Sequence, residues 1–459
     1  MSDATLAQAP PPKRPRVGFR GPGPRGPILL AFAGLSFLLT QPAAAQDGID
    51  SGDTAWMLVA SALVLLMTPR LAFFYGGLVR RKNVLSILMQ CFLCMSLMTV
   101  LWAIVGFSLA FGTSTLGGFV GDLDFFLLAG LDYGPWDGTS IPAPLFMIFQ
   151  GMFAIITPAL MVGAFAERMK FSAICWFTSL WLLLAYAPIC HWVWGGAEGF
   201  FGLGADGALD FAGGTVVHIN AGISGLIAAI VLGRREGYPQ ETSPPHNLPF
   251  AVLGAGLLWF GWFGFNAGSA VAANASAVNA FVVTHIATAA AATVWAGIDW
   301  VREGKPTLLG LITGAVAGLV AITPACGSVN AMGALGVGAG ASVCAYFAVT
   351  WAKVKFGYDD SLDVFGVHGV AGLWGAVAAG LFATATVPGN DANGLFFGNP
   401  GQVVIQLKAV LYTLVWASVV SVALLKALDS TLGLRVDGDS ERIGLDVAEH
   451  RETAYTLVE

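Results

Sequence analysis

Apolar segments long enough to cross a lipid bilayer recur along this chain, and they limit the folds open to it. A bilayer-spanning α-helix needs about 20 apolar residues. Of the 459 residues, 56% are hydrophobic and only 11% are charged, and the mean hydropathy is +0.73. A soluble domain carries about 25% charged residues. The sequence therefore predicts an all-α polytopic membrane protein with about eleven transmembrane helices, at residues 54–79, 84–112, 142–166, 171–193, 213–233, 248–268, 277–301, 306–323, 329–352, 364–386 and 402–428.

The basic residues alternate between the two sides of the predicted membrane. Cytoplasmic loops of membrane proteins are enriched in Lys and Arg. With the first span starting outside, the external loops at 113–141, 194–212 and 387–401 contain neither residue. The loops predicted to be cytoplasmic carry Arg80, Arg81 and Lys82; Arg168 and Lys170; Arg234 and Arg235; Arg302 and Lys305; Lys353 and Lys355; and finally Lys426, Arg435, Arg442 and Arg451. This pattern supports eleven spans and a cytoplasmic C-terminus.

Two basic residues, Arg70 and Lys408, remain inside predicted spans. A charge in hydrocarbon needs a partner, a cavity or an interface. We expect structural roles for both, at helix or subunit contacts.

The N-terminal segment has the pattern of a secretory signal. Basic residues precede an apolar run at 28–39, and the run ends in the small-residue stretch at 42–45. We predict a signal peptide at 1–45, cleaved after Ala45, which leaves the mature N-terminus outside. An uncleaved anchor would give the same topology downstream. The membrane domain then covers 46–428, and the polar segment 429–459 is a cytoplasmic tail.

A short repeat links the fifth and tenth spans. Residues 217–225 (VHINAGISG) and 367–375 (VHGVAGLWG) share the pattern V-H-x-x-A-G-x-x-G. An offset of five spans turns the second copy upside down, which gives two inverted five-helix repeats with a path between them. The alternative is chance similarity between two helices rich in Gly and Ala.

The repeat places two histidines, His218 and His368, at equivalent positions within apolar spans. An intramembrane histidine can simply hydrogen-bond a neighbouring helix. Two imidazoles side by side could instead relay a proton or bind a small neutral molecule in a dry pore. His285 lacks a repeat mate and is predicted to be structural. The six cysteines lie in or beside apolar segments and indicate packing, so we expect no metal site and no cofactor.

Aromatic side chains cluster around the predicted path, at Phe149 and Phe153, at Trp192 and Trp194, and at Trp262, Phe263 and Phe265. Such residues commonly form belts at the membrane interface. Their faces can also attract a small cation, and the hydroxyl of Ser269 could accept one of its hydrogen bonds. Asp210, eight residues before His218, could cap the helix or stabilise an incoming cation.

Four motifs, at 71–80 (LAFFYGGLVR), 210–221 (DFAGGTVVHINA), 263–269 (FGFNAGS) and 363–370 (DVFGVHGV), resemble the Amt/Mep/Rh ammonium transporter family over nearly the whole mature chain. The resemblance implies a bacterial inner-membrane protein of eleven helices, two inverted halves plus a C-terminal helix, assembled as a homotrimer with one path per subunit. The tail at 433–450 resembles that of bacterial members, which implies regulation by a PII-type signalling protein. One departure is Arg70, where relatives usually have Gly.

The same resemblance implies roles for individual residues. It makes His218 and His368 the pore histidines, and Phe153, Trp194, Ser269 and Asp210 the ammonium recruitment site. Phe153 and Phe265 would form a gate, and Phe149 and Trp262 are further pore-side candidates.

The physical logic favours transport of ammonium by deprotonation. A bare cation in a dry pore faces a large desolvation cost, which the ion avoids if it loses a proton and crosses as ammonia. Methylammonium is an analogue for uptake measurements. The alternatives are a passive ammonia/CO2 gas channel of the Rh type and an ammonium sensor. An intramembrane enzyme is disfavoured, because the spans contain no GxSxG or HExxH motif.

Overall fold

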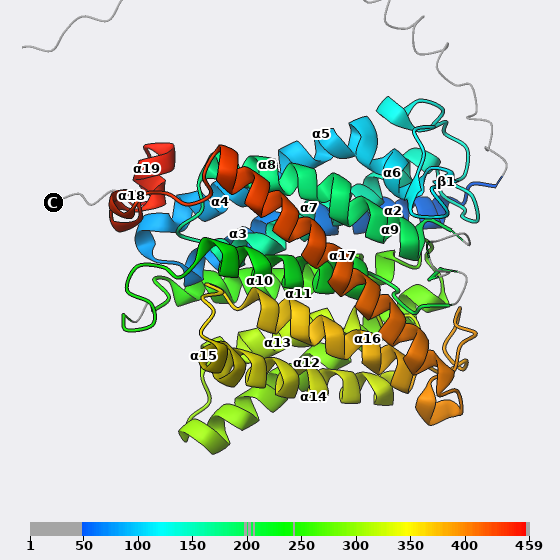
Figure 1. Cartoon of the computed structure of the whole chain (residues 1–459). Helices are drawn as coiled ribbons and strands as arrows, with labels where there is room; N and C mark the ends of the chain where they lie inside the picture. Colours follow the sequence, from blue (N-terminus) through cyan, green and yellow to red (C-terminus); the bar gives the residue numbers. More distant parts are fainter. Residues whose placement is uncertain (1–47, 197–199, 201–202, 205–206, 242–243, 456–459) are drawn as a thin grey trace, which may run out of the picture. The chain divides into compact units, whose positions relative to one another are not determined.

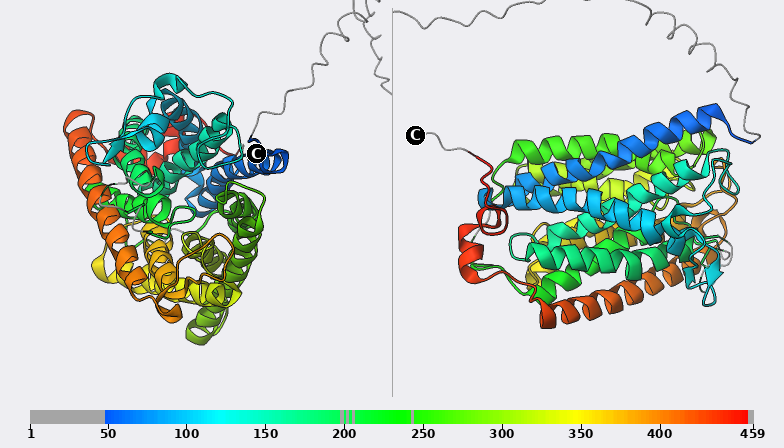
Figure 2. Two further views of the ribbon diagram at one scale, coloured as in Figure 1. Left: turned by 90° about the vertical axis from the view of Figure 1, so that its right-hand side faces the viewer. Right: turned by 90° about the horizontal axis from the view of Figure 1, so that it is seen from above.

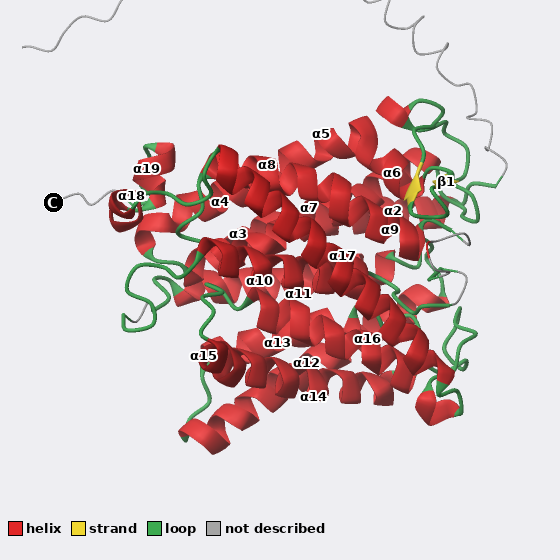
Figure 3. Ribbon diagram, viewed as in Figure 1, coloured by secondary structure: helices red, strands yellow, loops and turns green. Residues whose placement is uncertain are grey.

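The computed structural model describes residues 48–455 except 197–199, 201–202, 205–206 and 242–243. The predicted signal peptide at 1–45 lies outside the described residues. The described part is a bundle of long helices with one two-residue strand pair, β1 (Ser114–Thr115) and β2 (Val120–Gly121), in which Ser114 pairs with Gly121 (Figure 3).

The first half of the bundle contains five spans. They are α2 (Ser51–Leu65) with α3 (Met67–Leu78); α4 (Val84–Leu93), η2 (Cys94–Met98), α5 (Thr99–Leu101), η3 (Trp102–Gly106) and α6 (Phe107–Phe111); α7 (Ala143–Phe165); α8 (Phe171–Trp181), η5 (Leu182–Tyr186) and α9 (Ala187–Trp194); and η7 (Gly214–Ile219) with α10 (Asn220–Leu232). Short 3₁₀ turns, η1 (Arg81–Asn83) and η4 (Phe126–Leu128), lie in its loops.

The second half repeats this number and adds one helix. It contains α11 (Leu248–Gly268); α12 (Ala275–Glu303); α13 (Leu308–Ile322); α14 (Ala331–Phe347), η8 (Ala348–Ala352) and α15 (Lys353–Phe356); η9 (Phe365–Val370) with α16 (Ala371–Phe382); the 3₁₀ turn η10 (Leu395–Phe397); and α17 (Gly401–Thr431). Within the described residues, ten helices are long and apolar enough to cross a membrane. The eleventh predicted span is present as α13, which has 15 residues. The prediction of a multi-pass helical membrane protein with about eleven spans is confirmed.

The spans differ in how deeply they lie in the bundle. In α7, 94% of the most apolar window is buried, whereas in α17 the figure is 33%. Figure 2 shows α17 running along the edge of the bundle in both views. The long C-terminal helix therefore braces the outside, and α7 belongs to the centre where a path would run.

The helices that carry the repeat pack against each other through glycines. A Cβ on Gly222 would lie 2.3 Å from the backbone nitrogen of Gly369, and one on Gly372 would lie 3.1 Å from Cβ of His218. Each repeat helix thus presents its glycine to the histidine-bearing segment of the other. Small residues permit this close approach where lipid provides no hydrophobic drive between helices.

The tail after α17 folds back onto loops that the sequence predicts to be cytoplasmic. It contains α18 (Gly438–Ile443) and α19 (Leu445–His450), which lie at the end of the bundle opposite β1 (Figure 1). The backbone N–H of Val436 donates to the carbonyl of Arg168 at 3.1 Å, and that of Ser86 donates to the Asp446 carboxylate at 2.8 Å. The Arg435 guanidinium pairs with the buried Glu441 at 2.7 Å. The predicted tail at 429–459 is therefore a docked segment as far as the structure describes it.

Arg70 and Lys408 occupy different environments. Arg70 is buried between α3 and α11, where it donates to the Leu257 carbonyl at 2.9 Å and its guanidinium lies 5.5 Å from the centre of the Phe260 ring. Lys408 is exposed on α17, seven residues after its first residue, so its amine can extend toward the membrane interface at that end of the helix.

Candidate functional site

Two histidines from the two halves of the bundle face each other. His218 lies in η7 and His368 in η9, and their Nδ1 atoms are 3.3 Å apart. The rings are nearly parallel, with centroids 5.4 Å apart and planes inclined by 15°. Their exposed fractions are only 1% and 3%. We refer to His218 and His368 as the histidine pair.

Both members of the pair lie on short π-helical segments. Such segments are rare and are often found at functional sites. Gly213, which precedes η7, has a left-handed φ of 113°, and a Cβ there would lie 2.5 Å from Cγ2 of Val217. A glycine is required at this position because both the backbone angle and the contact exclude a side chain. The local sequence G-G-T-V-V-H thus allows the wide turn that carries His218.

A narrow cavity surrounds the pair. We call it the histidine cavity; its volume is about 10 Å³. A cavity needs about 10–15 Å³ to hold one water, so this space has no room for a file of waters. Apart from the pair, it is lined by Met67, Leu71, Ile156, Leu160, Val217, Leu258, Trp262, Phe265 and Val316.

The indole of Trp262 forms one wall of the histidine cavity. Its ring lies nearly parallel to that of His218, with centroids 5.5 Å apart and planes inclined by 16°. Its Nε1–H donates at 2.8 Å to Oγ1 of Thr323, which follows α13 in the same half of the bundle. Because that donor is occupied, the pair alone offers polar atoms to the cavity. The Nε2 atom of His218 is buried and has no partner among the described residues.

An aromatic stack separates the histidine cavity from the β1 end of the bundle, which the sequence predicts to be external. The rings of Phe153 and Phe265 have centroids 4.4 Å apart, and Phe153 also contacts Trp194 at 5.7 Å and Phe149 at 5.1 Å. Phe265 lines the histidine cavity, whereas Trp194 lines a large outer cavity of about 1010 Å³. The stack therefore closes the route between the two cavities.

Asp210 binds the backbone at the start of η7. Its carboxylate accepts the N–H groups of Gly213 at 2.9 Å, Thr215 at 2.8 Å and Val216 at 3.2 Å. It also accepts the N–H of Gly214 and the O–H of the Thr215 side chain. Its own carbonyl accepts the Nε1–H of Trp194 at 2.8 Å. Asp210 thus caps the histidine-bearing segment and orients the tryptophan of the aromatic stack.

Ser269 lies just after α11, beside the aromatic stack. Its hydroxyl donates to the Phe265 carbonyl at 2.9 Å, and a Cβ on the preceding Gly268 would lie 3.0 Å from the Phe149 ring. Among the described residues, no hydrogen bond joins Ser269 to Trp194. The serine therefore lies near the stack, without completing a ring around Trp194.

A third cavity, which we call the inner cavity, lies beyond the histidine pair, toward the side that the sequence predicts to be cytoplasmic. Its volume is about 400 Å³, and its walls include the carboxylates of Asp299, Glu303 and Asp363. His368 lines both the inner cavity and the histidine cavity. The three cavities thus lie in series, separated by the aromatic stack and by the histidine pair. Among the described residues, no group of three or more His, Cys, Asp or Glu side chains could hold a metal ion.

Comparison with known proteins shows the family to which this chain belongs. The sequence model described as "Ammonium Transporter Family" matches residues 55–455. The chain belongs to the ammonium transporter family. An ammonium transporter of Aquifex aeolicus is 50% identical over 434 residues, which cover 94% of this chain and 98% of that one. An ammonium transporter of Bacillus subtilis is 46% identical over 408 residues, with coverages of 88% and 98%.

Solved structures of ammonium transporter relatives agree with this assignment. Mep2 of Saccharomyces cerevisiae superposes with a TM-score of 0.80 at 36% identity, over 86% of this chain and 89% of that one. A protein described as "Sensor Amt Protein" gives a TM-score of 0.80 at 28% identity, over 87% and 98%. This chain is thus a multi-pass membrane protein of the ammonium transporter family, and its relatives are named as transporters.

Sequence reasoning missed one residue that supports the histidine pair through the backbone. Asp360, fully buried, precedes His368 by the same eight residues that separate Asp210 from His218. Its carboxylate accepts the N–H groups of Val364 at 3.1 Å and Phe365 at 2.7 Å, at the start of the second histidine-bearing helix. The signal was present as a D-x7-H spacing in both copies of the repeat. No sequence pattern could have revealed Thr323, whose hydroxyl accepts the Trp262 hydrogen bond, because the two residues are far apart in the sequence.

Proposed function

We propose that this ammonium transporter family member captures NH4+ on the external side, removes its proton and conducts NH3 past the histidine pair. The observation that carries this proposal is the 3.3 Å Nδ1–Nδ1 contact between His218 and His368 inside an otherwise apolar cavity of about 10 Å³. A cavity of this kind disfavours a cation, because it provides neither a carboxylate nor water. A neutral molecule that needs one donor and one acceptor fits it.

The contact between the histidines gives the pair a defined hydrogen-bonding pattern. A neutral imidazole carries one N–H. If the Nδ1–H of one ring donates to Nδ1 of the other, the donor ring has a bare Nε2 and the acceptor ring has an Nε2–H. The pair then presents one acceptor and one donor along the path. Ammonia can donate to the first and accept from the second, so it exchanges its lost hydration for two protein contacts.

Selectivity against potassium follows from the ability of ammonium to lose a proton. The aromatic stack and the apolar cavity impose the same desolvation cost on K+ and NH4+, since the two ions have similar size and charge. Ammonium escapes this cost by giving up a proton, and potassium cannot. Deprotonation is thus the step that distinguishes the two ions.

We assign the external steps to the aromatic stack. Trp194 and Phe153 hold the cation by their ring faces, Ser269 accepts one of its hydrogen bonds, and Asp210 supports the site through the Trp194 indole. Phe153 and Phe265, stacked at 4.4 Å, act as a gate that opens as ammonia passes. Phe149 and Trp262 hold the gate and the pair in place. Asp210 contributes its charge from behind the backbone that it caps.

The assembly and setting proposed for this chain follow from the family and the surface. We propose a homotrimer in the bacterial inner membrane, with the N-terminus outside and the tail in the cytoplasm, where a PII-type protein binds. Arg70 supports the oligomer, because it is a basic group within a span and no carboxylate among the described residues pairs with it. Polar groups at such depth are usually covered by protein.

Methylammonium uptake tests the proposal. Wild type, His218→Ala, His368→Ala and the matched control His285→Ala, at equal abundance, are compared in proteoliposomes. His285 lies on the outer face of α12, against Trp259, and lines neither the histidine cavity nor the inner cavity. We expect the two pore substitutions to lose most uptake or to admit potassium, and the control to retain both rate and selectivity. Unchanged uptake and selectivity in both pore variants would reject the proposal.

A second measurement decides between net charge transport and gas conduction. An ammonium jump on a supported bilayer that contains the protein evokes a current if a proton crosses with each ammonia. A passive gas channel gives uptake without current. A sensor role, favoured by the likeness to the protein described as "Sensor Amt Protein", predicts that a chain lacking residues 433–459 transports normally but no longer alters a cellular nitrogen response.

A further inference from the structure

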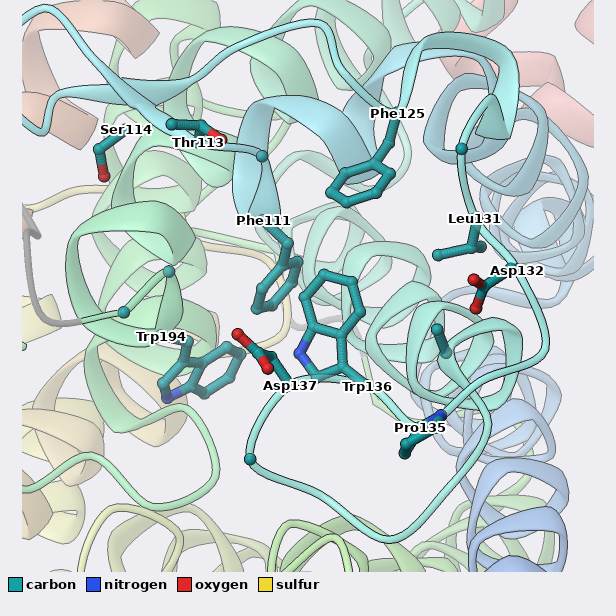
Figure 4. Close-up of a pocket in the computed structure, with 16 residues that line it drawn as sticks. Phe111, Thr113, Ser114, Phe125, Leu131, Asp132, Pro135, Trp136, Asp137 and Trp194 are labelled. Carbon is teal, nitrogen blue, oxygen red and sulfur yellow. The ribbon is translucent and has the colours of Figure 1, made fainter. Parts of the chain in front are cut away.

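The outer cavity contains a carboxylate that the proposed pathway does not use. The cavity has a volume of about 1010 Å³, and its lining includes Asp132, Asp137 and the rings of Phe111, Trp136 and Trp194. Figure 4 shows the Asp137 carboxylate pointing into the space between Trp136 and Trp194, beside Phe111. Trp194 also belongs to the aromatic stack below. Asp137 thus lies at the mouth of the route that leads to the gate.

The loop that carries Asp137 is anchored to the bundle by ring stacking and by hydrogen bonds. The Trp136 ring stacks on Phe146 of α7, with centroids 4.8 Å apart and planes inclined by 6°. Both the backbone N–H and the hydroxyl of Thr139 donate to the Trp136 carbonyl, at 2.9 and 2.8 Å, and Gly138 has a φ of 73°. Asp137 therefore occupies a corner of a tight turn anchored to the bundle. Its carboxylate is placed by the fold, although the residue itself is exposed.

The Asp137 carboxylate has no partner. It accepts no hydrogen bond and forms no ion pair with any residue that the structure describes, whereas Asp132 accepts the N–H of Gly134 at 2.8 Å. The external loops at 113–141, 194–212 and 387–401 contain no Lys or Arg that could neutralise it. An uncompensated carboxylate inside a concave surface concentrates cations.

Aromatic faces determine which cations the cavity favours. Trp rings attract organic ammonium ions, including quaternary ones, through their negative faces. A carboxylate between two indoles provides both the charge and the faces. The volume of the outer cavity leaves room for the ion with its hydration shell, in contrast to the histidine cavity of about 10 Å³.

We propose that Asp137, with Trp136 and Trp194, forms an outer site that holds a hydrated ammonium-type cation before it reaches the aromatic stack. The site raises the rate at which ions are captured, and it does not take part in deprotonation. It therefore lowers the concentration that half-saturates transport and leaves the maximal rate unchanged. The inference rests on the proposed function, which it extends by one step on the external side.

The same site binds ions that cannot be transported. Tetramethylammonium has no proton to lose, so on the proposed mechanism it cannot pass the gate. It fits a site made of a carboxylate and aromatic faces. We therefore expect it to inhibit methylammonium uptake competitively, through Asp137.

The experiment compares wild type with Asp137→Asn, Asp137→Glu and the matched control Asp391→Asn in proteoliposomes that contain the full chain. Asp391 is an exposed carboxylate on the same side of the bundle and does not line the outer cavity. Initial rates of methylammonium uptake are measured against concentration in about 0.01 M and about 1 M sodium chloride, where the Debye lengths are about 30 Å and 3 Å.

We expect Asp137→Asn to raise the half-saturating concentration about three- to tenfold at low salt, with the maximal rate unchanged and the difference shrinking at high salt. Asp137→Glu should retain the wild-type half-saturating concentration, and Asp391→Asn should change it little. Inhibition by tetramethylammonium should weaken in Asp137→Asn alone. An unchanged half-saturating concentration, an equal shift in Asp391→Asn, or a fall in the maximal rate alone would overturn the outer site.

Failure of the outer site can be told apart from failure of the proposed function. Uptake that His218→Ala abolishes and Asp137→Asn leaves untouched rejects only the outer site. If the wild type shows no uptake, the proposed function fails. The outer site is then judged by whether tetramethylammonium chloride, compared with sodium chloride, stabilises wild type but not Asp137→Asn against thermal unfolding.

Discussion

Asp210 and Asp360 perform the same task on two sides of the histidine pair. Each precedes a histidine of the pair by eight residues, and each accepts backbone N–H groups at the start of the segment that carries that histidine. The two carboxylates belong to oppositely oriented halves, so they support the histidine pair from opposite sides. The histidine pair is thus fixed from both directions.

Replacement of the two caps should have unequal effects. An amide has one oxygen where the carboxylate has two, so Asp210→Asn leaves several of the five donors at this carboxylate without an acceptor, at about 1–3 kcal/mol each. Asp360→Asn affects two backbone donors and should cost less. Thermal unfolding in detergent, followed by tryptophan fluorescence, measures both, with Asp391→Asn as control. Equal stability of Asp210→Asn and wild type would contradict the capping role.

Asp360 should also make stability depend on pH. Burial raises the pKa of this carboxyl from 3.8 to about 6, against the opposing charge of Lys353. A raised pKa in the folded state means that the stabilising contribution is complete below the unfolded value and is lost as pH rises through about 6. The difference between a pKa of 3.8 and one of about 6 corresponds to about 3 kcal/mol. The stability of wild type relative to Asp360→Asn should therefore fall between pH 4 and pH 7; a flat difference would refute this.

Glu167 should show the opposite dependence. This buried carboxylate pairs with Arg80 at 2.9 Å and Arg235 at 3.1 Å. Burial alone would raise its pKa, but the two guanidinium groups outweigh that and hold the pKa below its usual value. The stabilisation is present above the unfolded value of about 4.3 and is lost as pH falls through the folded pKa. Glu167→Gln should cost about 3–5 kcal/mol at pH 7 and much less in acid, as thermal unfolding at both pH values will show.

The close contact between the repeat helices gives a steric prediction. Gly222→Ala places a methyl group 2.3 Å from the Gly369 backbone nitrogen, so η9 must move away from α10 and the histidine pair must separate. We expect methylammonium uptake to fall at least tenfold or the protein to lose stability. Gly297→Ala in α12 is the matched control, because nothing lies within 4 Å of its Cβ; it should gain a few tenths of a kcal/mol to about 1 kcal/mol from helix propensity. Similar behaviour of the two variants would refute the packing argument.

Arg70 offers a test of the proposed trimer. Its guanidinium has five N–H donors, of which one bonds to Leu257, and no carboxylate pairs with it among the described residues. If a second copy supplies the missing acceptors, Arg70→Leu should lower the trimer fraction seen by native mass spectrometry, and Arg70→Lys should lower it less. A trimer that is unaffected or strengthened by leucine would place Arg70 away from the subunit contact.

The spans could be predicted because bilayer crossing imposes a simple rule on composition. Each predicted segment contains an observed helix, and even the shortest, α13, lies within the predicted 306–323. The internal breaks could not be read in the same way. The first span is interrupted at Leu66, three residues before Pro69, and several spans contain π-helical turns such as η2 and η8. These depend on how neighbouring helices pack, which local sequence does not specify.

In the candidate site, too, some features could be predicted from the sequence and others depend on how the helices pack. The repeat places His218 and His368 in equivalent helices, and the structure brings their Nδ1 atoms to 3.3 Å. Trp262 could be proposed from its motif, but its hydrogen bond to Thr323 joins residues 61 positions apart and leaves no pattern in the sequence. Asp137 was not singled out because an acidic residue in a polar loop is common. Only the folded loop shows that it points between two indoles.

The inverted relation of the two halves has a consequence for the direction of flow. A histidine pair supported alike from both sides, with a carboxylate-bearing cavity before and after it, has no built-in rectification. On the proposed route, ammonia would run backwards whenever its gradient reversed, so a cell in poor medium would lose nitrogen through an open path. Any element that prevents backward flow of ammonia must then lie outside the two repeats. The last span, α17, and the docked tail lie outside the two five-helix repeats, so they are the parts of this molecule that break the symmetry.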